Sequence, residues 1–360
     1  MSKPAARPRI SVIVPAYNAQ AALGRCLDSI ERQTLRAIEA IVVDDGSADA
    51  TARVASGHAA ADARVRAIRQ ENAGVSAARN AGLAVARGDV AMFVDADDWI
   101  DADACERVLG VFGATGAEVV VFGARCEPES AATAHTREVL SPRDATFDGF
   151  SPELLFSANA QPYACRMGVS RALLERERIA FPEGLSLAED AVFQFLAYPL
   201  SRRTVLISDK PYHYAMDEGS AVHEHNAAGP GRKVEQHLRA IEEILSQWSR
   251  RGLLGLCPAD MVQWCLDFTL FDIARMEGLA RAQSLARLDS ALEEAYGEGY
   301  AALPRKAAVR RMAAAVRGCR RGNDGVDDAA CAFDGAAGKL SLVRFFVATR
   351  GLRQCIERFV

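Results

Sequence analysis

Short apolar runs alternate with amphipathic stretches along the first third of the chain. The predicted strands are mostly apolar and rich in β-branched residues, and they span 10–14, 38–43, 65–69, 90–94 and 118–122. The predicted helices follow these strands, and they cover 21–33, a stretch from residue 50, 74–87 and 101–112. Strands that are apolar on both faces and alternate with helices are typical of a parallel sheet covered on both sides. We therefore expect an α/β fold with a mostly parallel sheet.

Helical periodicity replaces this alternation in the last third of the chain. We expect an α/β domain over 1–228 and a helical C-terminal subdomain over 229–360. Within the subdomain, the segment 305–321 has seven basic and no acidic residues, and the segment 341–360 mixes arginines with large apolar side chains. Two interpretations stay open: basic amphipathic helices that lie on an anionic membrane, or a helical subdomain with a solvated basic face.

Composition and charge narrow the class of protein. The chain has 360 residues and a net charge of −4, so nucleic acid is not an expected partner. Its nine cysteines are scattered without a CxxC pair, and residues 1–9 lack the apolar core of a signal peptide. No run reaches the roughly 20 apolar residues that a membrane span needs. We expect a cytoplasmic protein, with peripheral contact to the inner face of the plasma membrane as an open alternative.

Polar side chains collect where the predicted strands end. Tyr17 and Asn18 follow the first strand, Asp44 and Asp45 follow the second, and the acids of 95–98 follow the fourth. In parallel sheets, ligands bind outside the carboxyl ends of the strands. This arrangement predicts a binding site at one edge of the sheet. The first strand is not followed by GxGxxG, so the pattern does not indicate a dinucleotide site.

Three carboxylates follow the strand over 90–94 directly: Asp95, Asp97 and Asp98. Clustered carboxylates repel one another unless a cation lies among them. Oxygen ligands suit Mg²⁺ or Mn²⁺, which usually share their coordination with substrate phosphates. The alternative is that Asp97 or Asp98 caps the helix that follows.

A second acidic stretch lies within 181–200. Ser186 and Glu189 have the spacing of a capping box, in which Ser186 is the N-cap and Glu189 reaches back to it. Asp190 is not needed for such a cap, so its carboxylate is available to face a cleft.

Four ordered motifs, SVIVPAYN, VVDDGSAD, ENAGVSAARNAG and GDVAMFVDADD, resemble those of family 2 glycosyltransferases. The resemblance implies the GT-A fold, with a nucleotide-sugar half over 9–125 and an acceptor half over 126–228. It also implies a nucleotide-sugar donor, usually UDP-linked, a divalent cation and inversion at the anomeric carbon. The transferred group would be a hexose-type sugar, and the acceptor a hydroxyl of a cell-surface polysaccharide or lipid-linked glycan.

The resemblance also implies roles for individual residues. Asp45 would accept the uracil N–H, with Asp44 as a structural acid, and Arg79 would neutralise or hydrogen-bond the nucleotide. Asp95 and Asp97 would hold Mg²⁺ or Mn²⁺, and Asp95 would also reach the ribose. The remaining donor-binding positions shape the pocket around the base and ribose: Pro15, Ala16, Tyr17, Asn18, Asn72 and Ala96.

Asp190 falls on the position of the family's catalytic base, with Glu189 as the fallback. An inverting transfer needs one base to take the proton of the acceptor hydroxyl. Two rival functions remain. A nucleotidyltransferase of similar fold would be expected to carry a Gly-rich phosphate loop with a basic residue after the first strand, and the sequence PAYNAQ has neither. A non-catalytic nucleotide-sugar-binding protein would not need the acids at 95, 97 and 190.

Overall fold

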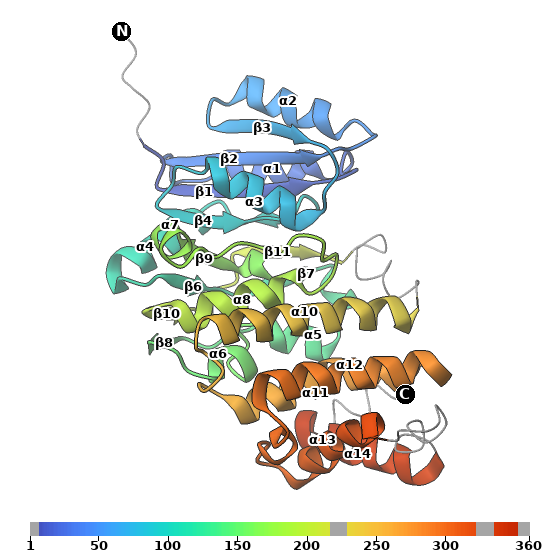
Figure 1. The fold of residues 1–360 in the computed structure, drawn as a ribbon. Helices are drawn as coiled ribbons and strands as arrows, with labels where there is room; N and C mark the ends of the chain where they lie inside the picture. Colours follow the sequence, from blue (N-terminus) through green and yellow to red (C-terminus); the bar gives the residue numbers. More distant parts are fainter. Residues whose placement is uncertain (1–6, 217–228, 322–334, 352–360) are drawn as a thin grey trace. The chain divides into compact units, whose positions relative to one another are not determined.

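The computed structural model describes residues 7–216, 229–321 and 335–351 and divides the chain into two compact units, Met1–Asp217 and Glu218–Val360. Figure 1 shows strands and helices in the first unit and helices in the second. The expected domain boundary between residues 228 and 229 falls at the edge of a segment outside the described residues, so it stays a prediction.

The N-terminal unit is built on an eight-stranded mixed sheet with the order β3-β2-β1-β4-β9-β6-β10-β8. Its pairs β1–β2, β2–β3, β1–β4 and β6–β10 are parallel, and the pairs of β9 and β8 are antiparallel. The strands span β1 Ile10–Ala16, β2 Ile38–Asp45, β3 Val65–Gln70, β4 Val90–Phe93, β6 Val119–Val121, β8 Ala145–Asp148, β9 Met167–Ser170 and β10 Arg203–Leu206.

The register of the central strands brings the polar loops to one edge. Ala16 at the end of β1 pairs with Asp44 of β2, and Ile13 pairs with Phe93 of β4. All residues of β1, β2 and β4 are buried, because both faces of this part of the sheet are covered. The loops after these three strands therefore lie side by side, as predicted.

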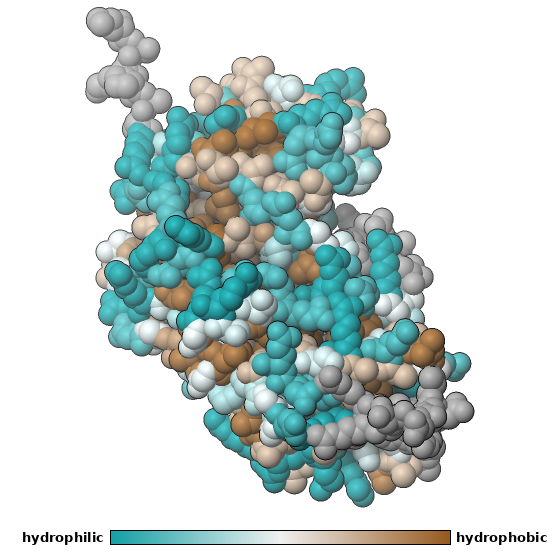
Figure 2. Space-filling view, viewed as in Figure 1, coloured by the Kyte–Doolittle hydropathy of each residue, from teal (hydrophilic) through white to brown (hydrophobic). Residues whose placement is uncertain are grey.

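Helices cover both faces of the central strands. On one face, Val12 and Val42 share a core with Cys26 and Leu27 of α1. On the other, Ala78 of α3 packs with Ile41 and Val43. The helices of this unit span α1 Leu23–Glu31, α2 Thr51–Ala61, α3 Val75–Val85, α4 Ala104–Thr115, α5 Ala134–Val139, α6 Glu153–Phe156, α7 Arg171–Glu177 and α8 Glu189–Leu200. Figure 2 shows a mostly hydrophilic outer face, with a hydrophobic band over the region of β3 and α3.

A second, three-stranded sheet was not predicted. It has the order β5-β11-β7 and consists of Trp99–Ile100, Tyr212–Ala215 and Ala124–Glu127. β11 pairs antiparallel with β5, directly after the acids, and parallel with β7. This small sheet links the region of 95–98 to a strand more than a hundred residues further on.

The C-terminal unit is helical, as predicted. Its described helices are α10 Pro230–Arg250, α11 Pro258–Ile273, α12 Gly278–Tyr296, α13 Ala307–Arg321 and α14 Gly335–Arg350. None of the helices in the described ranges has the length and apolar character that crossing a bilayer requires. The seven cysteines of these ranges, four in the first unit and three in the second, are unpaired and buried.

Candidate active site

The acid loop, residues 95–98, follows β4 and is held from several sides. Its backbone closes on itself, because the Asp98 N–H donates to the Asp95 carbonyl oxygen (3.0 Å). Helix α1 holds it from one side: the Arg25 Nη2 donates to the Asp97 carbonyl oxygen (2.7 Å), and the Cys26 thiol contacts that of Asp95 (3.6 Å). The loop is therefore a fixed turn, and the positions of its carboxylates are set by its neighbours.

Asp98 is the buried anchor of this loop. Its side chain is 1% exposed, and it accepts hydrogen bonds from the Tyr212 hydroxyl (2.5 Å) and the Ala215 N–H (2.7 Å). Burial, followed by the charges of Asp95 and Asp97, raises the pKa of Asp98 to about 8. Helix α4 begins at Ala104 with Asp103 as its N-cap residue, so the alternative of Asp97 or Asp98 as a helix cap is wrong.

Arg79 of α3 joins the acid loop to the start of α8. Its Nη2 lies 3.0 Å from Asp95 Oδ1, and its Nη1 lies 2.9 Å from Glu189 Oε1 and 3.0 Å from Asp190 Oδ1. The Arg79 side chain is 4% exposed, and a buried charge requires partners of this kind. Asp95 and Asp190, which are far apart in the sequence, therefore contact the same guanidinium.

The predicted capping box at the start of α8 is wrong. The helix begins at Glu189, and its N-cap residue is Ala188, which has a left-handed backbone (φ 68°) and no side chain to cap with. Ser186 is therefore not the N-cap. The Glu189 carboxylate is used by Arg79, since a nearby buried guanidinium offers a stronger partner than a backbone amide.

Asp190 lies in the first turn of α8, beside Arg79. Burial raises the pKa of Asp190 to about 7, and the charges of Glu189 and Asp95 add to the rise while Arg79 opposes it. A backbone hydrogen bond from Ala164 also reaches it. A carboxylate with a pKa near neutrality can accept a proton at physiological pH and release it again.

The loops after β1 and β2 form the other side of the site. The Asn18 N–H donates to Ser47 Oγ (2.9 Å), and Asn18 Oδ1 accepts from the Ala48 N–H (3.0 Å). Tyr17 is 54% exposed, so its ring is available as a wall for a ligand. The other predicted positions of this side differ in access: Pro15 and Ala16 are buried, Ala96 is 8% exposed, and Asn72 is exposed.

Asp45 and Asp44 are both buried but have different partners. Asp45 accepts the N–H groups of Ala73 (2.9 Å) and Gly74 (2.8 Å), which orients it at the start of α3. Asp44 accepts the Ser47 N–H (3.0 Å), and Arg69 lies 3.4 Å from its other oxygen. Both carboxylates thus have structural contacts, and the binding of a base by Asp45 stays a prediction.

Two carboxylates of the acid loop have the chemistry of ligands for a hard divalent cation. Asp95 lies two residues after the end of β4, and its side chain is 30% exposed although one oxygen contacts Arg79. Asp97 is half-buried two residues further on, in a turn whose backbone is fixed. Two carboxylates with partial access to solvent suit Mg²⁺ or Mn²⁺. Their roles as ligands stay predictions.

Several contacts of the site were not predicted from the sequence. Arg25, Cys26 and Tyr212 all hold the acid loop, and these contacts join segments that are distant in the sequence. The pairing of Arg79 with three acids was also missed, because it depends on how α3 and α8 meet in space.

Known proteins are similar to this chain in sequence. The model of the family "Glycosyl transferase family 2" matches residues 11–159. EpsH of Bacillus subtilis (strain 168) is 29% identical over 272 residues, which is 68% of this chain and 79% of EpsH. The succinoglycan biosynthesis protein ExoO of Rhizobium meliloti (strain 1021) is 26% identical over 312 residues, which is 85% of this chain and 88% of ExoO.

The fold also matches a solved structure. The crystal structure of Staphylococcus aureus TarS 1–349 in complex with UDP-GlcNAc superposes with a TM-score of 0.69 and 21% identity, covering 90% of this chain and 91% of that one. This likeness shows that the architecture is shared, and it confirms the expected GT-A fold with a helical C-terminal region. The family match over residues 11–159, the relatives and the shared fold together support a glycosyltransferase of the family 2 type.

Proposed function

We propose that this enzyme moves a hexose-type sugar from a UDP-linked donor to a hydroxyl of a cell-surface polysaccharide or lipid-linked glycan, with inversion at the anomeric carbon. One observation carries the proposal: Arg79 lies within 3.0 Å of Asp95, from the donor side, and of Asp190, the proposed base. Acids with different predicted roles thus meet around one buried cation, as a single site requires.

The proposed step is a displacement at the anomeric carbon. Asp190 takes the proton of the acceptor hydroxyl while the hydroxyl oxygen forms the new bond and the bond to the diphosphate breaks. Arg79 lowers the free energy of the ionised Asp190 but does not remove the effect of burial, so a fraction of Asp190 is ready to accept a proton at neutral pH. Glu189 shares Nη1 of Arg79 and holds the guanidinium in place.

The cation is proposed from the chemistry of the carboxylates, and the donor from the names of related proteins. Asp95 and Asp97 would hold Mg²⁺ or Mn²⁺, which would neutralise the negative charge of the departing diphosphate when bound. TarS has been crystallised with UDP-GlcNAc and is named a poly(ribitol-phosphate) beta-N-acetylglucosaminyltransferase, and ExoO is named for succinoglycan biosynthesis. These names support a UDP-linked donor and a polymeric glycan acceptor for this chain.

The test of this function uses the purified full chain, MnCl₂ and a panel of nucleotide sugars. We expect release of UDP from at least one UDP-sugar, through transfer or slow hydrolysis, and loss of that release with EDTA. Nucleoside diphosphate release is measured with a coupled assay. Release from none of the donors, with or without an added glycan acceptor mixture, would contradict the proposal.

Two matched substitutions test the base. Asp190→Asn keeps the shape of the side chain and one oxygen for Arg79 but cannot accept a proton, so we expect kcat to fall by roughly 10²–10⁴ with UDP affinity changed little. Glu189→Gln changes the neighbouring carboxylate, which contacts the same Nη1 of Arg79. We expect its kcat to fall far less. If Glu189→Gln is the variant that loses turnover and Asp190→Asn is not, Glu189 is the base.

A further inference from the structure

Tyr212 is a buried phenol that links β11 to the acid loop. It is 0% exposed, its hydroxyl donates to Asp98 Oδ2 (2.5 Å), and the same oxygen accepts the N–H of Asp95 (3.2 Å). One hydroxyl therefore contacts the first and the last residue of the loop. Asp97 lies between these two attachment points.

We propose that Tyr212 is a positioning residue, which sets the conformation of the acid loop and thereby the direction of the Asp95 and Asp97 carboxylates. The inference rests on the proposed function, in which those carboxylates hold the cation and diphosphate of the donor. Tyr212 exerts this effect without touching the substrate. It acts through the backbone of Asp95 and the side chain of Asp98.

The acid loop is held by β11 on one side and by α1 on the other. On one side, β11 supplies both donors to the buried Asp98, the Tyr212 hydroxyl and the Ala215 N–H. On the other, α1 holds the backbone carbonyl of Asp97 through Arg25. Without the hydroxyl, Asp98 keeps one of these two donors and the Asp95 N–H loses its acceptor. Buried polar groups that lose a partner favour a rearranged backbone.

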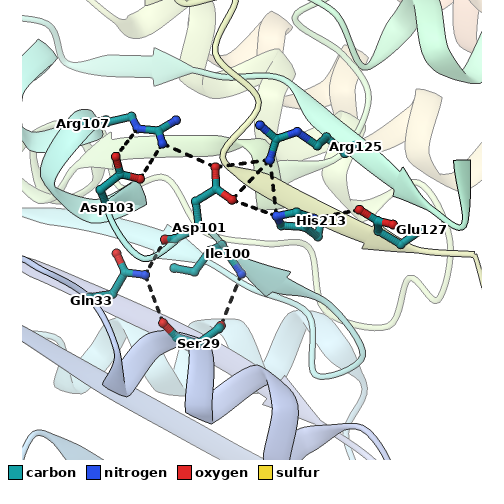
Figure 3. Close-up of polar contacts among 9 residues, drawn as sticks. All are labelled: Ser29, Gln33, Ile100, Asp101, Asp103, Arg107, Arg125, Glu127 and His213. Carbon is teal, nitrogen blue, oxygen red and sulfur yellow. Dashed lines mark hydrogen bonds and ion pairs between the residues drawn. The ribbon is translucent and has the colours of Figure 1, made fainter.

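The opposite face of β11 is fastened independently of this hydroxyl (Figure 3). His213 alternates with Tyr212 along the strand, and its ring nitrogens lie 2.9 Å from Asp101 Oδ1 and 3.0 Å from Glu127 Oε1. Asp101 also pairs with Arg125 (3.2 Å). Strand β11 therefore has anchors on β7 and after β5 that a change at the Tyr212 hydroxyl leaves in place.

A ring stack adds a further link on this face. The His213 and Trp99 rings are stacked with centroids 5.1 Å apart, and the Arg25 guanidinium lies 3.9 Å from the Trp99 centroid. Arg25 is the same side chain that holds the Asp97 carbonyl. Because these contacts do not involve the phenol, we expect Tyr212→Phe to fold with β11 in place, and to release only the hydroxyl's hold on the acid loop.

The chain offers a matched control in its other unit. Tyr300 is also 0% exposed, and its hydroxyl donates to the buried Asp289 (2.6 Å). Tyr300→Phe removes the same atom from the same kind of buried Tyr–Asp pair, in the unit that does not contain the acid loop. A general loss of stability would affect both variants, whereas a loss of loop position would affect Tyr212→Phe alone.

The experiment compares the wild type, Tyr212→Phe and Tyr300→Phe as full chains. Hydrogen exchange of the free proteins is read by mass spectrometry on peptides covering 94–98, and UDP affinity is measured by calorimetry with and without MnCl₂. For Tyr212→Phe we expect exchange at 94–98 to be faster by about tenfold or more, and UDP affinity in Mn²⁺ to be weaker by about tenfold. For Tyr300→Phe we expect both to match the wild type.

The outcomes separate the inference from the proposed function. If wild type binds no UDP under either condition, the donor assignment fails, and the exchange measurement still decides whether Tyr212 positions the loop. If wild type binds UDP and Tyr212→Phe matches it in exchange and in affinity with Mn²⁺, the inference is overturned. Equal changes in Tyr212→Phe and Tyr300→Phe would assign Tyr212 a structural role only and would also overturn it.

Discussion

Glu39 shows how one buried carboxylate joins three segments of the N-terminal unit. It is 4% exposed at the start of β2 and accepts hydrogen bonds from Ser11 Oγ of β1 (2.6 Å) and from the backbone N–H and the guanidinium of Arg87 (2.6 and 3.0 Å). Burial alone would raise its pKa, but the hydrogen bonds from Ser11 and Arg87 bring the pKa of Glu39 below its ordinary 4.5. The fold therefore favours its ionised form.

This lowered pKa predicts a pH-dependent contribution to stability. A carboxylate whose pKa is lower in the folded state stabilises the fold above the unfolded pKa, and the effect is lost as the pH falls through the folded pKa. We expect Glu39→Gln to lower the free energy of unfolding by about 1–3 kcal/mol at pH 7, and by progressively less below pH 4.5. Urea unfolding across this range measures it.

Glu138 is exposed, so Glu138→Gln serves as the control for Glu39→Gln. We expect the free energy of unfolding of this control variant to stay close to that of the wild type at every pH. A difference between wild type and Glu39→Gln that stays constant from pH 7 to pH 3 would show that ionisation of Glu39 is not the cause.

A residue's role can be predicted from the sequence when its partners lie nearby in the chain or when a motif marks it. The sequence identified the acids at 95–98 and Asp190, because they lie at strand ends and in a recognisable motif. It assigned Glu189 to a local cap, since Ser186 has the right spacing, whereas the structure pairs Glu189 with Arg79, 110 residues earlier in the chain. Local spacing cannot weigh a partner so distant in sequence.

At the scale of elements, helix α3 packs very closely against strand β1. A Cβ atom on Gly82 would lie 2.5 Å from Ile13 Cγ2, in a strand that is fully buried. The absence of a side chain therefore lets the helix that carries Arg79 lie against the sheet.

We expect Gly82→Ala to lower the free energy of unfolding by about 1–3 kcal/mol, because overpacking outweighs the gain in helix propensity. Gly110→Ala in α4 is the matched control: its added Cβ meets no atom within 4 Å, so propensity alone should raise stability by about 0.5–1 kcal/mol. Thermal unfolding measures both. If Gly82→Ala were as stable as Gly110→Ala, the close packing would not constrain α3.

Strands with a continuous apolar run were predicted, and short strands without such a run were not. The apolar runs of β1, β2 and β4 are buried throughout, and the predicted ranges overlap the observed strands. The strands of the small sheet are two to four residues long, and none of them has a long apolar run. They are defined by pairing between distant segments. The polar segment 127–148 contains the short helix α5 and the edge strand β8.

At the scale of the whole molecule, the basic helices α13 and α14 pack within the C-terminal unit. Val309, Met312 and Val316, the apolar positions of α13, are 0%, 3% and 0% exposed. Lys306 donates to the Ala348 carbonyl oxygen of α14 (2.6 Å), and Arg350 of α14 pairs with Asp267 (2.8 Å). The side chains of Arg320 and Arg321 lie outside the described part. An apolar face that is buried in a helical core is not available for insertion into lipid.

We therefore expect the full chain to stay with the unbound fraction when it is floated with anionic liposomes in 0.15 M salt. Protein in each fraction is quantified by gel. Neutral liposomes of the same size serve as the control. Salt-sensitive flotation with the anionic vesicles alone would restore the alternative of a peripheral membrane contact.

The seven buried thiols of the described ranges have a practical consequence. Burial raises the pKa of Cys26, Cys165 and Cys265, so in the folded chain they are both shielded and weakly nucleophilic. An alkylating reagent would label them only when the surrounding structure opens. Because they are distributed over both units, peptide mapping of the label would record the opening of each unit separately, with no engineered reporter.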